Sequence, residues 1–208
     1  MTAGVARVAA VAATRPYPWP WDGAFDPARM ALVLLGAQRW WAERTEDVPA
    51  ALAALGSLRA AAHARGVPVI VVRHVASTGA RASRPTALPG PGGPDAVSAL
   101  AECEADIVVG ATGLDGCYGG PLEPTLRGLG VDRVLLAGLG LAGPVHSTMR
   151  SLNDQGYECL LIADACSHEG SSTRDGAISS VLMSGGIFGA VGETAAVLVA
   201  LSTLEESA

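Results

Sequence analysis

The chain has 208 residues, of which 50% are hydrophobic, and it carries a formal net charge of -6 with a pI near 5.1. This length suffices to bury one sizeable core, so a single α/β domain is expected. Nucleic-acid binding depends on clustered Lys and Arg, and an acidic chain lacks that basis, so nucleic acid is excluded as a partner. No apolar run reaches the roughly 20 residues of a membrane helix, and the N-terminus does not resemble a signal peptide. We therefore expect a cytoplasmic protein that does not associate with membranes.

The N-terminal segment has an unusual spacing of prolines. Pro16, Pro18 and Pro20 alternate with large aromatic residues, and prolines at alternate positions prevent a helix because they remove backbone donors. Residues 1–29 are therefore predicted to form an extended arm, followed by the domain over residues 30–208. We expect the arm to lie across its own domain or a neighbouring subunit; recognition of a partner through Pro and Trp is the alternative.

The remaining chain alternates short apolar runs with helical periods. Apolar residues recur at helical spacing from Val48 to Ala62 and from Val145 to Leu152. The fold class is therefore predicted as α/β, a three-layer sandwich around a six-stranded, mostly parallel sheet with right-handed crossovers. A Pro- and Gly-rich surface loop is expected over Ser77–Pro94. The predicted strands are Met30–Leu35, Val67–Val72, Asp106–Val109, Val134–Ala137, Cys159–Ala163 and Ile187–Val191.

Neither the cysteines nor the histidines form a local metal-binding motif. No CxxC, HExxH or Asp-x-His-x-His spacing occurs, so we predict free thiols, no structural zinc and no cofactor. The residues concerned are Cys103, Cys117, Cys159, Cys166, His63, His74, His146 and His168.

Four segments carry a resemblance to a known family. They are Val145–Arg150, Asn153–Leu161, the glycine-rich Gly185–Val191 and the Pro-Tyr-x-Trp-Pro arm at Pro16–Pro20. Their sequences resemble those of the isochorismatase-like hydrolase superfamily, and the resemblance extends over about residues 15 to 200. It is most similar to the branch that includes biuret and ureidoacrylate amidohydrolases. That resemblance implies hydrolysis of an amide or ureide C–N bond by a cysteine thiolate, assisted by an Asp and a Lys.

The same resemblance implies that the catalytic residues are missing. Gly36 stands where the family has its Asp, and Pro144 where it has its nucleophilic Cys. Ala111, or Gly110 if the loop shifts by one residue, stands where the family has its Lys. Proline removes the thiol and a probable oxyanion-binding N–H together, although it suits the first turn of a helix.

We therefore predict a pseudoenzyme that acts as a structural or regulatory partner of an active paralogue, as a homo-oligomer (dimer or tetramer) or a hetero-oligomer. The alternative is a protein that binds a neutral small molecule, or an enzyme with different chemistry, in the altered pocket. That pocket is predicted to be lined by Gly36, Gln38, Trp41, Ala111, Cys117, Tyr118, Leu141, Gly143, Pro144 and His146.

Two further readings remain open from the residues themselves. Gly138–Gly143 is a literal GxGxxG between a predicted strand and a helix, and Asp164 ends the next predicted strand, as in dinucleotide-binding units. The glycines could equally serve tight packing in a pocket that has lost its side chains. Cys117 could act as a relocated nucleophile if Asp115 or His146 lies beside it, or it could be structural.

Overall fold

The computed structural model describes residues 10–76, 88, 98–101 and 103–204. Its centre is a sheet with the strand order β3-β2-β1-β4-β5-β6, in which every neighbouring pair is parallel. This confirms the predicted six-stranded α/β fold. The strands are β1 (Met30–Leu35), β2 (Val69–His74), β3 (Ile107–Ala111), β4 (Arg133–Gly138), β5 (Glu158–Cys166) and β6 (Ala190–Gly192).

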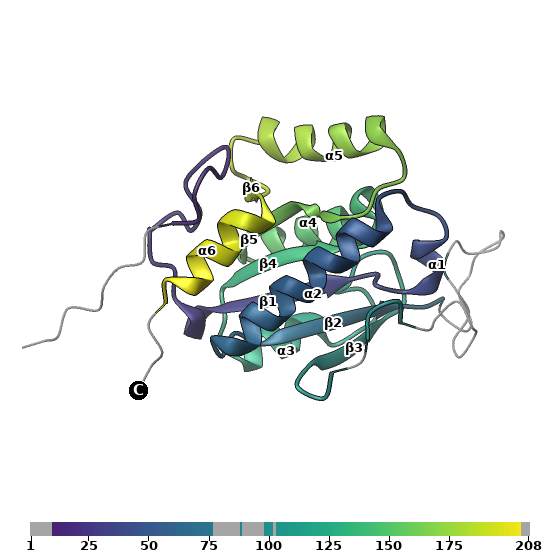
Figure 1. The fold of residues 1–208 in the computed structure, drawn as a ribbon, viewed down its shortest axis with the longest axis horizontal. Helices are drawn as coiled ribbons and strands as arrows, with labels where there is room; N and C mark the ends of the chain where they lie inside the picture. Colours follow the sequence, from purple (N-terminus) through teal and green to yellow (C-terminus); the bar gives the residue numbers. More distant parts are fainter. Residues whose placement is uncertain (1–9, 77–87, 89–97, 102, 205–208) are drawn as a thin grey trace, which may run out of the picture.

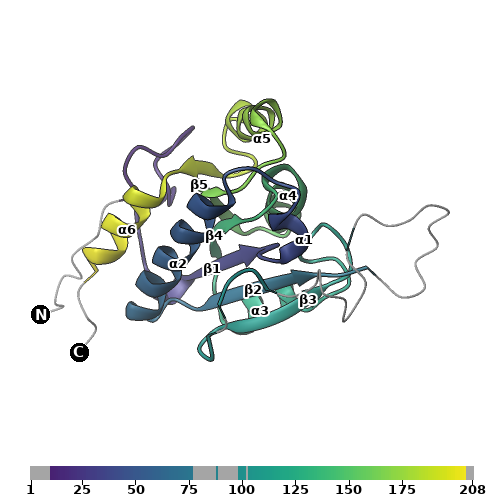
Figure 2. The same cartoon turned by 45° about the vertical axis from the view of Figure 1, so that its right-hand side comes forward.

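Helices cover both faces of the sheet, which gives the predicted three layers. Helices α2 and α6 lie on one face and α3 and α4 lie on the other, while α5 lies above the β6 end of the sheet (Figures 1 and 2). In the described part of the chain, none of these helices combines the length and apolar character needed to cross a membrane. The helices are α1 (Arg39–Ala42), α2 (Val48–Ala64), α3 (Leu122–Gly128), α4 (His146–Asp154), α5 (Ser171–Met183) and α6 (Thr194–Ser202).

The apolar patterns explain these elements. Every residue of β1 is buried, as expected for a central parallel strand that is covered on both faces. Helix α2 buries Ala51, Leu55, Leu58 and Ala62, which recur at helical spacing and face the sheet. The two patterns together account for the core between α2 and the central strands.

Two sequence predictions need correction, and a third falls outside the described residues. The strand predicted over Ile187–Val191 is limited to β6, because Gly186 and Gly189 adopt positive φ angles of 103° and 94° and place the preceding residues in a turn. Strand β5 continues to Cys166, so Asp164 lies within it and not at its end. The predicted loop over Ser77–Pro94 lies outside the described residues, apart from Leu88.

The described part of the N-terminal arm, from residue 10 onward, packs on its own domain. Trp19 is completely buried within the main hydrophobic core. Val11 forms an antiparallel bridge with Trp19, and Arg15 forms one with Val191 of β6. The described part of the arm thereby covers the β6 edge of the sheet.

A buried arginine fastens this arm to the sheet. The side chain of Arg133 in β4 is only 2% exposed, and its guanidinium pairs with Asp22 and donates to the carbonyl oxygen of Ala24. Its Nε lies 3.6 Å from a carboxylate oxygen of Glu158. Because a buried guanidinium needs acceptors, these arm residues are required for the burial of Arg133.

Candidate functional site at the carboxyl edge of the sheet

The three positions at which the resemblance implies missing catalytic residues lie at one edge of the sheet. Gly36 follows the last residue of β1, Ala111 ends β3, and Pro144 lies in the turn between β4 and α4. Because all strands are parallel, their carboxyl ends meet at the same edge, which is where open α/β sheets bind ligands. The three positions therefore lie at the carboxyl edge of the sheet.

Gly36 leaves no room for a side chain. Its φ angle is +61°, and a β-carbon there would stand 2.6 Å from the carbonyl oxygen of Leu139. The same β-carbon would stand 3.1 Å from Cγ of Pro144, so Gly36 and Pro144 lie against each other. The local backbone is compatible with glycine and strained for any other residue.

The indole of Trp41 fills the space around this glycine. A β-carbon at Gly36 would stand 3.0 Å from Trp41 Cδ1, one at Gly140 2.6 Å from its Cε3, and one at Gly143 2.8 Å from its Cη2. Trp41 itself is only 6% exposed. The pocket expected at these residues is thus occupied by the side chain of Trp41, which had been predicted only to line it.

A chain of hydrogen bonds holds Trp41 in this position. Its carbonyl oxygen accepts from Thr45 Oγ1 at 2.8 Å, and Thr45 Oγ1 accepts from Ser167 Oγ at 2.8 Å. Ser167 Oγ in turn accepts from the amide of Gly140 at 3.1 Å. Because each hydroxyl both donates and accepts, the chain links α1 directly to the glycine loop after β4.

Pro144 lies in a π-helical turn, Leu141–Val145, that leads into α4. Its position in the first turn agrees with the prediction, because the missing N–H needs no partner there. The carbonyl oxygen of Pro144 accepts from Thr148 Oγ1 at 2.7 Å, and that hydroxyl accepts from the amide of Gly116 at 2.8 Å. Thr148 therefore joins the start of α4 to the loop after β3.

A carboxylate faces the backbone amides of this turn. Glu169 Oε2 lies 3.4 Å from the amide nitrogen of Ala142, and Glu169 Oε1 would lie 3.5 Å from a β-carbon at Gly143. A negative charge is favourable at a helix start, where unpaired N–H groups point outward. The sequence analysis had not assigned Glu169 to the site, because it follows a different strand and only the fold brings it here.

Gln38 and His74 form a second buried unit at this edge. The Gln38 side chain accepts from the backbone amide of His74 at 2.7 Å and donates to its carbonyl oxygen at 3.0 Å. His74 pairs in register with Ala111, and its Nδ1 lies 2.8 Å from the carbonyl oxygen of Gly113. Burial lowers the pKa of His74 below its usual value. The His74 imidazole thus lies beside Ala111. The position of His74 at the end of a strand could have suggested this placement.

The geometry gives Cys117 no means of activation. Burial, followed by the nearby carboxylate of Asp115, raises the pKa of the Cys117 thiol to about 12. Asp115 accepts a hydrogen bond from the Cys117 backbone amide at 2.8 Å. Within the described residues, no hydrogen bond connects Cys117 to His146, whose own pKa is lowered by burial and by Arg150. Tyr118 is 65% exposed, at the surface of the same loop.

The GxGxxG segment has structural contacts that explain its glycines. Gly140 and Gly143 lie directly against the Trp41 ring, where a side chain would collide with it. Asp164 Oδ1 accepts from the amide and the hydroxyl of Thr194, at 2.7 and 2.8 Å, and so fixes the start of α6. These contacts favour the packing interpretation of the glycines over the binding of a pyrophosphate and a ribose.

Three buried nitrogen atoms at this end of the molecule lack a hydrogen-bond partner among the described residues. They are Nε1 of Trp41, Nε2 of His74 and Nε2 of His146. Buried polar atoms without partners are uncommon because each costs roughly 1–3 kcal/mol. They are groups to which a bound molecule could offer an acceptor or a donor.

Comparison with known proteins identifies the family. The sequence model of the isochorismatase domain matches residues 30–195. This chain belongs to the isochorismatase family. Solved structures of similar proteins share the fold of this isochorismatase-family chain at low sequence identity.

A cysteine hydrolase from Pseudomonas syringae pv. phaseolicola has a TM-score of 0.76 and 19% identity, over 86% of this chain and 95% of its own. An isochorismatase family protein from Burkholderia thailandensis has a TM-score of 0.71 and 24% identity, over 86% and 97%. An isochorismatase from Pseudomonas putida has a TM-score of 0.66 and 24% identity, over 82% and 90%. The likeness extends over nearly the whole length of each of these structures.

Proposed function

We propose that this isochorismatase-family chain is non-catalytic and acts as a structural or regulatory subunit, in a complex with an active paralogue. The proposal rests on the position of the Trp41 indole, which packs against Gly36 and Gly143 next to Pro144. These are the positions matched to the family's Asp and Cys, and a substrate carbonyl would have to enter the same space.

The chemistry of the residues present supports the proposal. Gly36 has no carboxylate to take up a proton, and Pro144 has neither a thiol nor an N–H. Loss of one oxyanion donor alone commonly costs about 3 kcal/mol of transition-state stabilisation. The nearest free thiol in the predicted set, Cys117, stays protonated because its pKa is near 12. Hydrolysis of amides or ureides by the family mechanism is therefore not expected.

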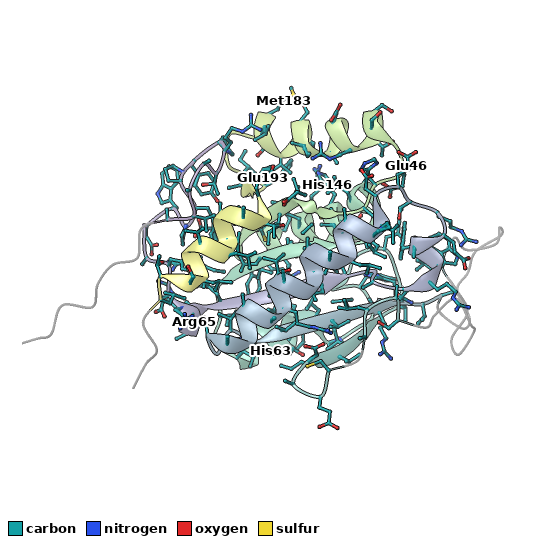
Figure 3. All side chains as sticks on the ribbon, in the orientation of Figure 1. Glu46, His63, Arg65, His146, Met183 and Glu193 are labelled. Carbon is teal, nitrogen blue, oxygen red and sulfur yellow. The ribbon has the colours of Figure 1, made fainter. Side chains whose placement is uncertain are left out.

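An exposed apolar surface supports the partner role. Trp21, Met183 and Ile187 are 75%, 83% and 74% exposed. The Trp21 ring contacts the Tyr17 ring edge to face at 5.2 Å, and Tyr17 packs against Gly186, the neighbour of Ile187. Met183, labelled in Figure 3, ends α5 just before this turn. Grouped exposed apolar side chains of this kind favour contact with another protein.

A second candidate function is the binding of a neutral small molecule at the carboxyl edge of the sheet. The unpartnered buried nitrogens of Trp41, His74 and His146 support it, because a ligand with carbonyl or hydroxyl groups would satisfy them. Binding there requires the Trp41 side chain to move, since it fills the space between the glycines.

Native mass spectrometry of the protein isolated from its own host tests both proposals. We expect a hetero-oligomer with an isochorismatase-family chain that has an intact Asp, Lys and Cys. A homo-oligomer that carries a small molecule would support the second candidate instead. In parallel, the purified chain is assayed for release of ammonia from amides and ureides. Turnover that persists in repeated purifications would contradict the non-catalytic assignment.

A further inference from the structure

We propose that His63, Cys103 and Asp106 form a zinc-binding site at the opposite edge of the sheet. His63 lies in the last turn of α2, and Asp106 immediately precedes β3. Cys103 lies three residues before Asp106 on the same loop. Because β3 begins next to Asp106, the cluster lies at the amino edge of the sheet, and Figure 3 shows His63 far from His146. The sequence motifs did not group these residues because His63 is distant from the other two along the chain.

The distances between the ligand atoms are close to those around a tetrahedral zinc ion. Nε2 of His63 lies 2.8 Å from Oδ1 of Asp106 and 3.9 Å from Sγ of Cys103. All three ligand atoms lie within 4.8 Å of one another. Tetrahedral Zn²⁺ with ordinary bond lengths separates N from O by about 3.4 Å and S from N by about 3.6 Å. Shifts of roughly half an ångström would therefore bring the His63–Asp106 pair and the His63–Cys103 pair to the spacing of ligands on one ion.

Both Cys103 and Asp106 approach the same imidazole nitrogen. A catalytic Cys-His-Asp arrangement would need the thiol and the carboxylate on different ring nitrogens, with one orienting the ring and the other exchanging the proton. Here both face Nε2 of His63. Convergence of three different ligand atoms on one point is the arrangement that a shared metal ion requires.

Arg59 holds the carboxylate in position. Its guanidinium lies 3.3 Å from Oδ2 of Asp106 and donates to the carbonyl oxygen of Ala101 at 2.7 Å, which leaves Oδ1 toward His63. The Asp106 side chain is only 3% exposed. A carboxylate fixed by a second partner is the usual support of a metal ligand. On binding, Cys103 would release its proton, so one thiolate and one carboxylate would balance the two charges of Zn²⁺.

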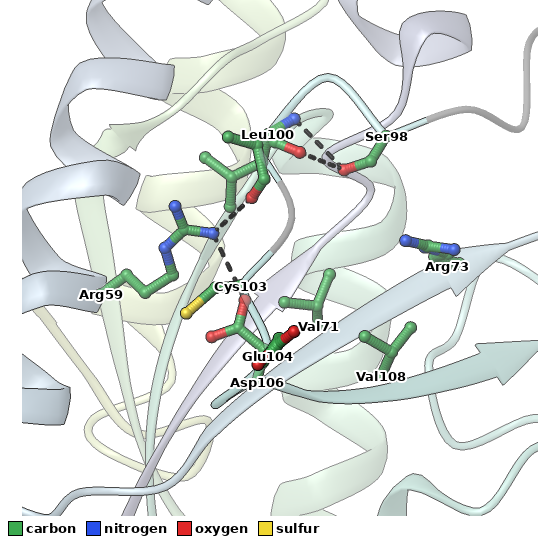
Figure 4. A pocket seen from close by; sticks show the side chains of 10 residues that line it. Arg59, Val71, Arg73, Ser98, Leu100, Cys103, Glu104, Asp106 and Val108 are labelled. Atoms are coloured by element: carbon green, nitrogen blue, oxygen red, sulfur yellow. Dashed lines mark hydrogen bonds and ion pairs between the residues drawn. The ribbon is translucent and has the colours of Figure 1, made fainter.

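A cavity of about 310 Å³ adjoins the cluster and is lined in part by Arg59, Cys103 and Asp106. Figure 4 shows Cys103 beside the Arg59 guanidinium and the Asp106 carboxylate. A fourth coordination position on this side would be open to water. Three protein ligands with one open position is typical of exchangeable or catalytic zinc, while a set of N, S and O ligands disfavours Mg²⁺ and Ca²⁺.

Metal titration of the apo protein tests this site. We expect Zn²⁺ to bind at micromolar or lower concentration in a one-to-one ratio, and Co²⁺ to give the charge-transfer absorption of a thiolate ligand. Cys103→Ser and His63→Ala should each weaken Zn²⁺ binding at least about 100-fold, and Cys103→Ser should abolish the thiolate band. Cys117→Ser and His146→Ala are the matched controls and should leave both readouts unchanged.

Alkylation provides an independent readout. Bound Zn²⁺ should slow the reaction of Cys103 with iodoacetamide, as mapped by mass spectrometry, and should not change the labelling of Cys117. Binding only at millimolar Zn²⁺, or equal binding by the wild type and both ligand variants, would overturn the proposal. None of these measurements depends on enzymatic activity, so the result is separate from the proposed function.

Discussion

The indole of Trp41 lies against Gly36, with its Cδ1 atom 3.0 Å from the point where a β-carbon at that glycine would stand. The glycine at position 36 and the position of the Trp41 ring depend on each other, because the ring can approach this closely only where position 36 has no side chain. An aspartate at position 36 would need both a different backbone conformation and a different position of Trp41. The absence of a side chain at position 36 is therefore part of the packing at this edge of the sheet.

Substitution of Gly36 by alanine is expected to destabilise the protein by about 3 kcal/mol. The positive φ angle alone costs an L-residue about 1–2 kcal/mol, and the close carbonyl of Leu139 adds to it. Gly66→Ala is the matched control, because Gly66 has a similar φ of +67° and no atom within 4 Å. Denaturant unfolding measures both variants. Equal losses would show that the crowding around Gly36 relaxes at little cost.

Restoring the family residues should not restore hydrolysis. The triple variant Gly36→Asp, Ala111→Lys, Pro144→Cys would still have the Trp41 ring against position 36 and would keep the Leu141–Ala142 turn before position 144. We expect no release of ammonia from ureides above the buffer rate. Turnover by the triple variant would show that these surroundings adapt to the catalytic residues, and addition of Trp41→Ala tests whether the indole is the remaining obstacle.

Thr148→Val is expected to destabilise the protein by about 1–3 kcal/mol. The substitution keeps the shape of the side chain but removes the acceptor of the Gly116 amide and the donor to the Pro144 carbonyl oxygen. Thr173→Val, at an exposed position of α5, is the control and should change stability by less than about 0.5 kcal/mol. A loss no larger than that of the control would mean that water replaces the missing hydroxyl.

Stability should decrease as the pH falls below about 6.5, partly because of His74. Burial lowers the pKa of His74 in the folded state, so below that pH the unfolded chain binds a proton that the folded protein excludes. The free energy of unfolding is therefore unaffected by this group above about pH 6.5 and declines on acidification. His74→Asn, which can still donate to the carbonyl oxygen of Gly113, should flatten the profile between pH 8 and 5.

His146→Asn separates the contribution of the half-buried His146 from that of His74 in the same experiment. Burial also lowers the pKa of His146, so its replacement should remove a part of the acid sensitivity and leave the part due to His74. Carboxylates contribute equally to the wild type and to either variant, so they cancel in the difference between profiles. A wild-type profile no steeper than that of His74→Asn would contradict the assignment.

Cys117 is expected to react slowly with iodoacetamide at pH 8. With a pKa near 12, its thiolate fraction is smaller than that of an ordinary cysteine by roughly three orders of magnitude. Mass spectrometry of labelled peptides over time measures the rate, with the urea-unfolded chain as the reference. Rapid labelling in the folded protein would reopen the possibility that Cys117 is a nucleophile.

The repeating apolar patterns were sufficient for most of the fold. The strand at Met30–Leu35 was predicted because a continuous apolar run reflects burial on both faces. The helix that spans Val48–Ala64 was predicted because apolar residues from Val48 to Ala62 recur at the spacing of one buried face. The end of the sheet was predicted less well. Glycines at positions 186 and 189 turn the chain where the apolar residues alone indicated a strand. Side-chain hydrophobicity does not record a positive φ angle.

The positions of Gly36, Ala111 and Pro144 at one edge of the sheet also followed from sequence, because parallel strands bring their carboxyl ends together. The packing of the side chains at that edge did not follow from the sequence. The ring of Trp41 could have pointed to solvent or into the site, and only its packing against Gly140 and Gly143 decides between them. Glu169 reaches the same turn from another strand.

The sequence by itself determined the family, the α/β architecture and the absence of an acid, an amine and a thiol at Gly36, Ala111 and Pro144, because these depend on residue identity and local periodicity. The tertiary structure alone decided that Trp41 fills the space beside Gly36, and that His63 meets Cys103 and Asp106. Contacts between residues distant along the chain depend on strand order and helix orientation, which no local pattern encodes.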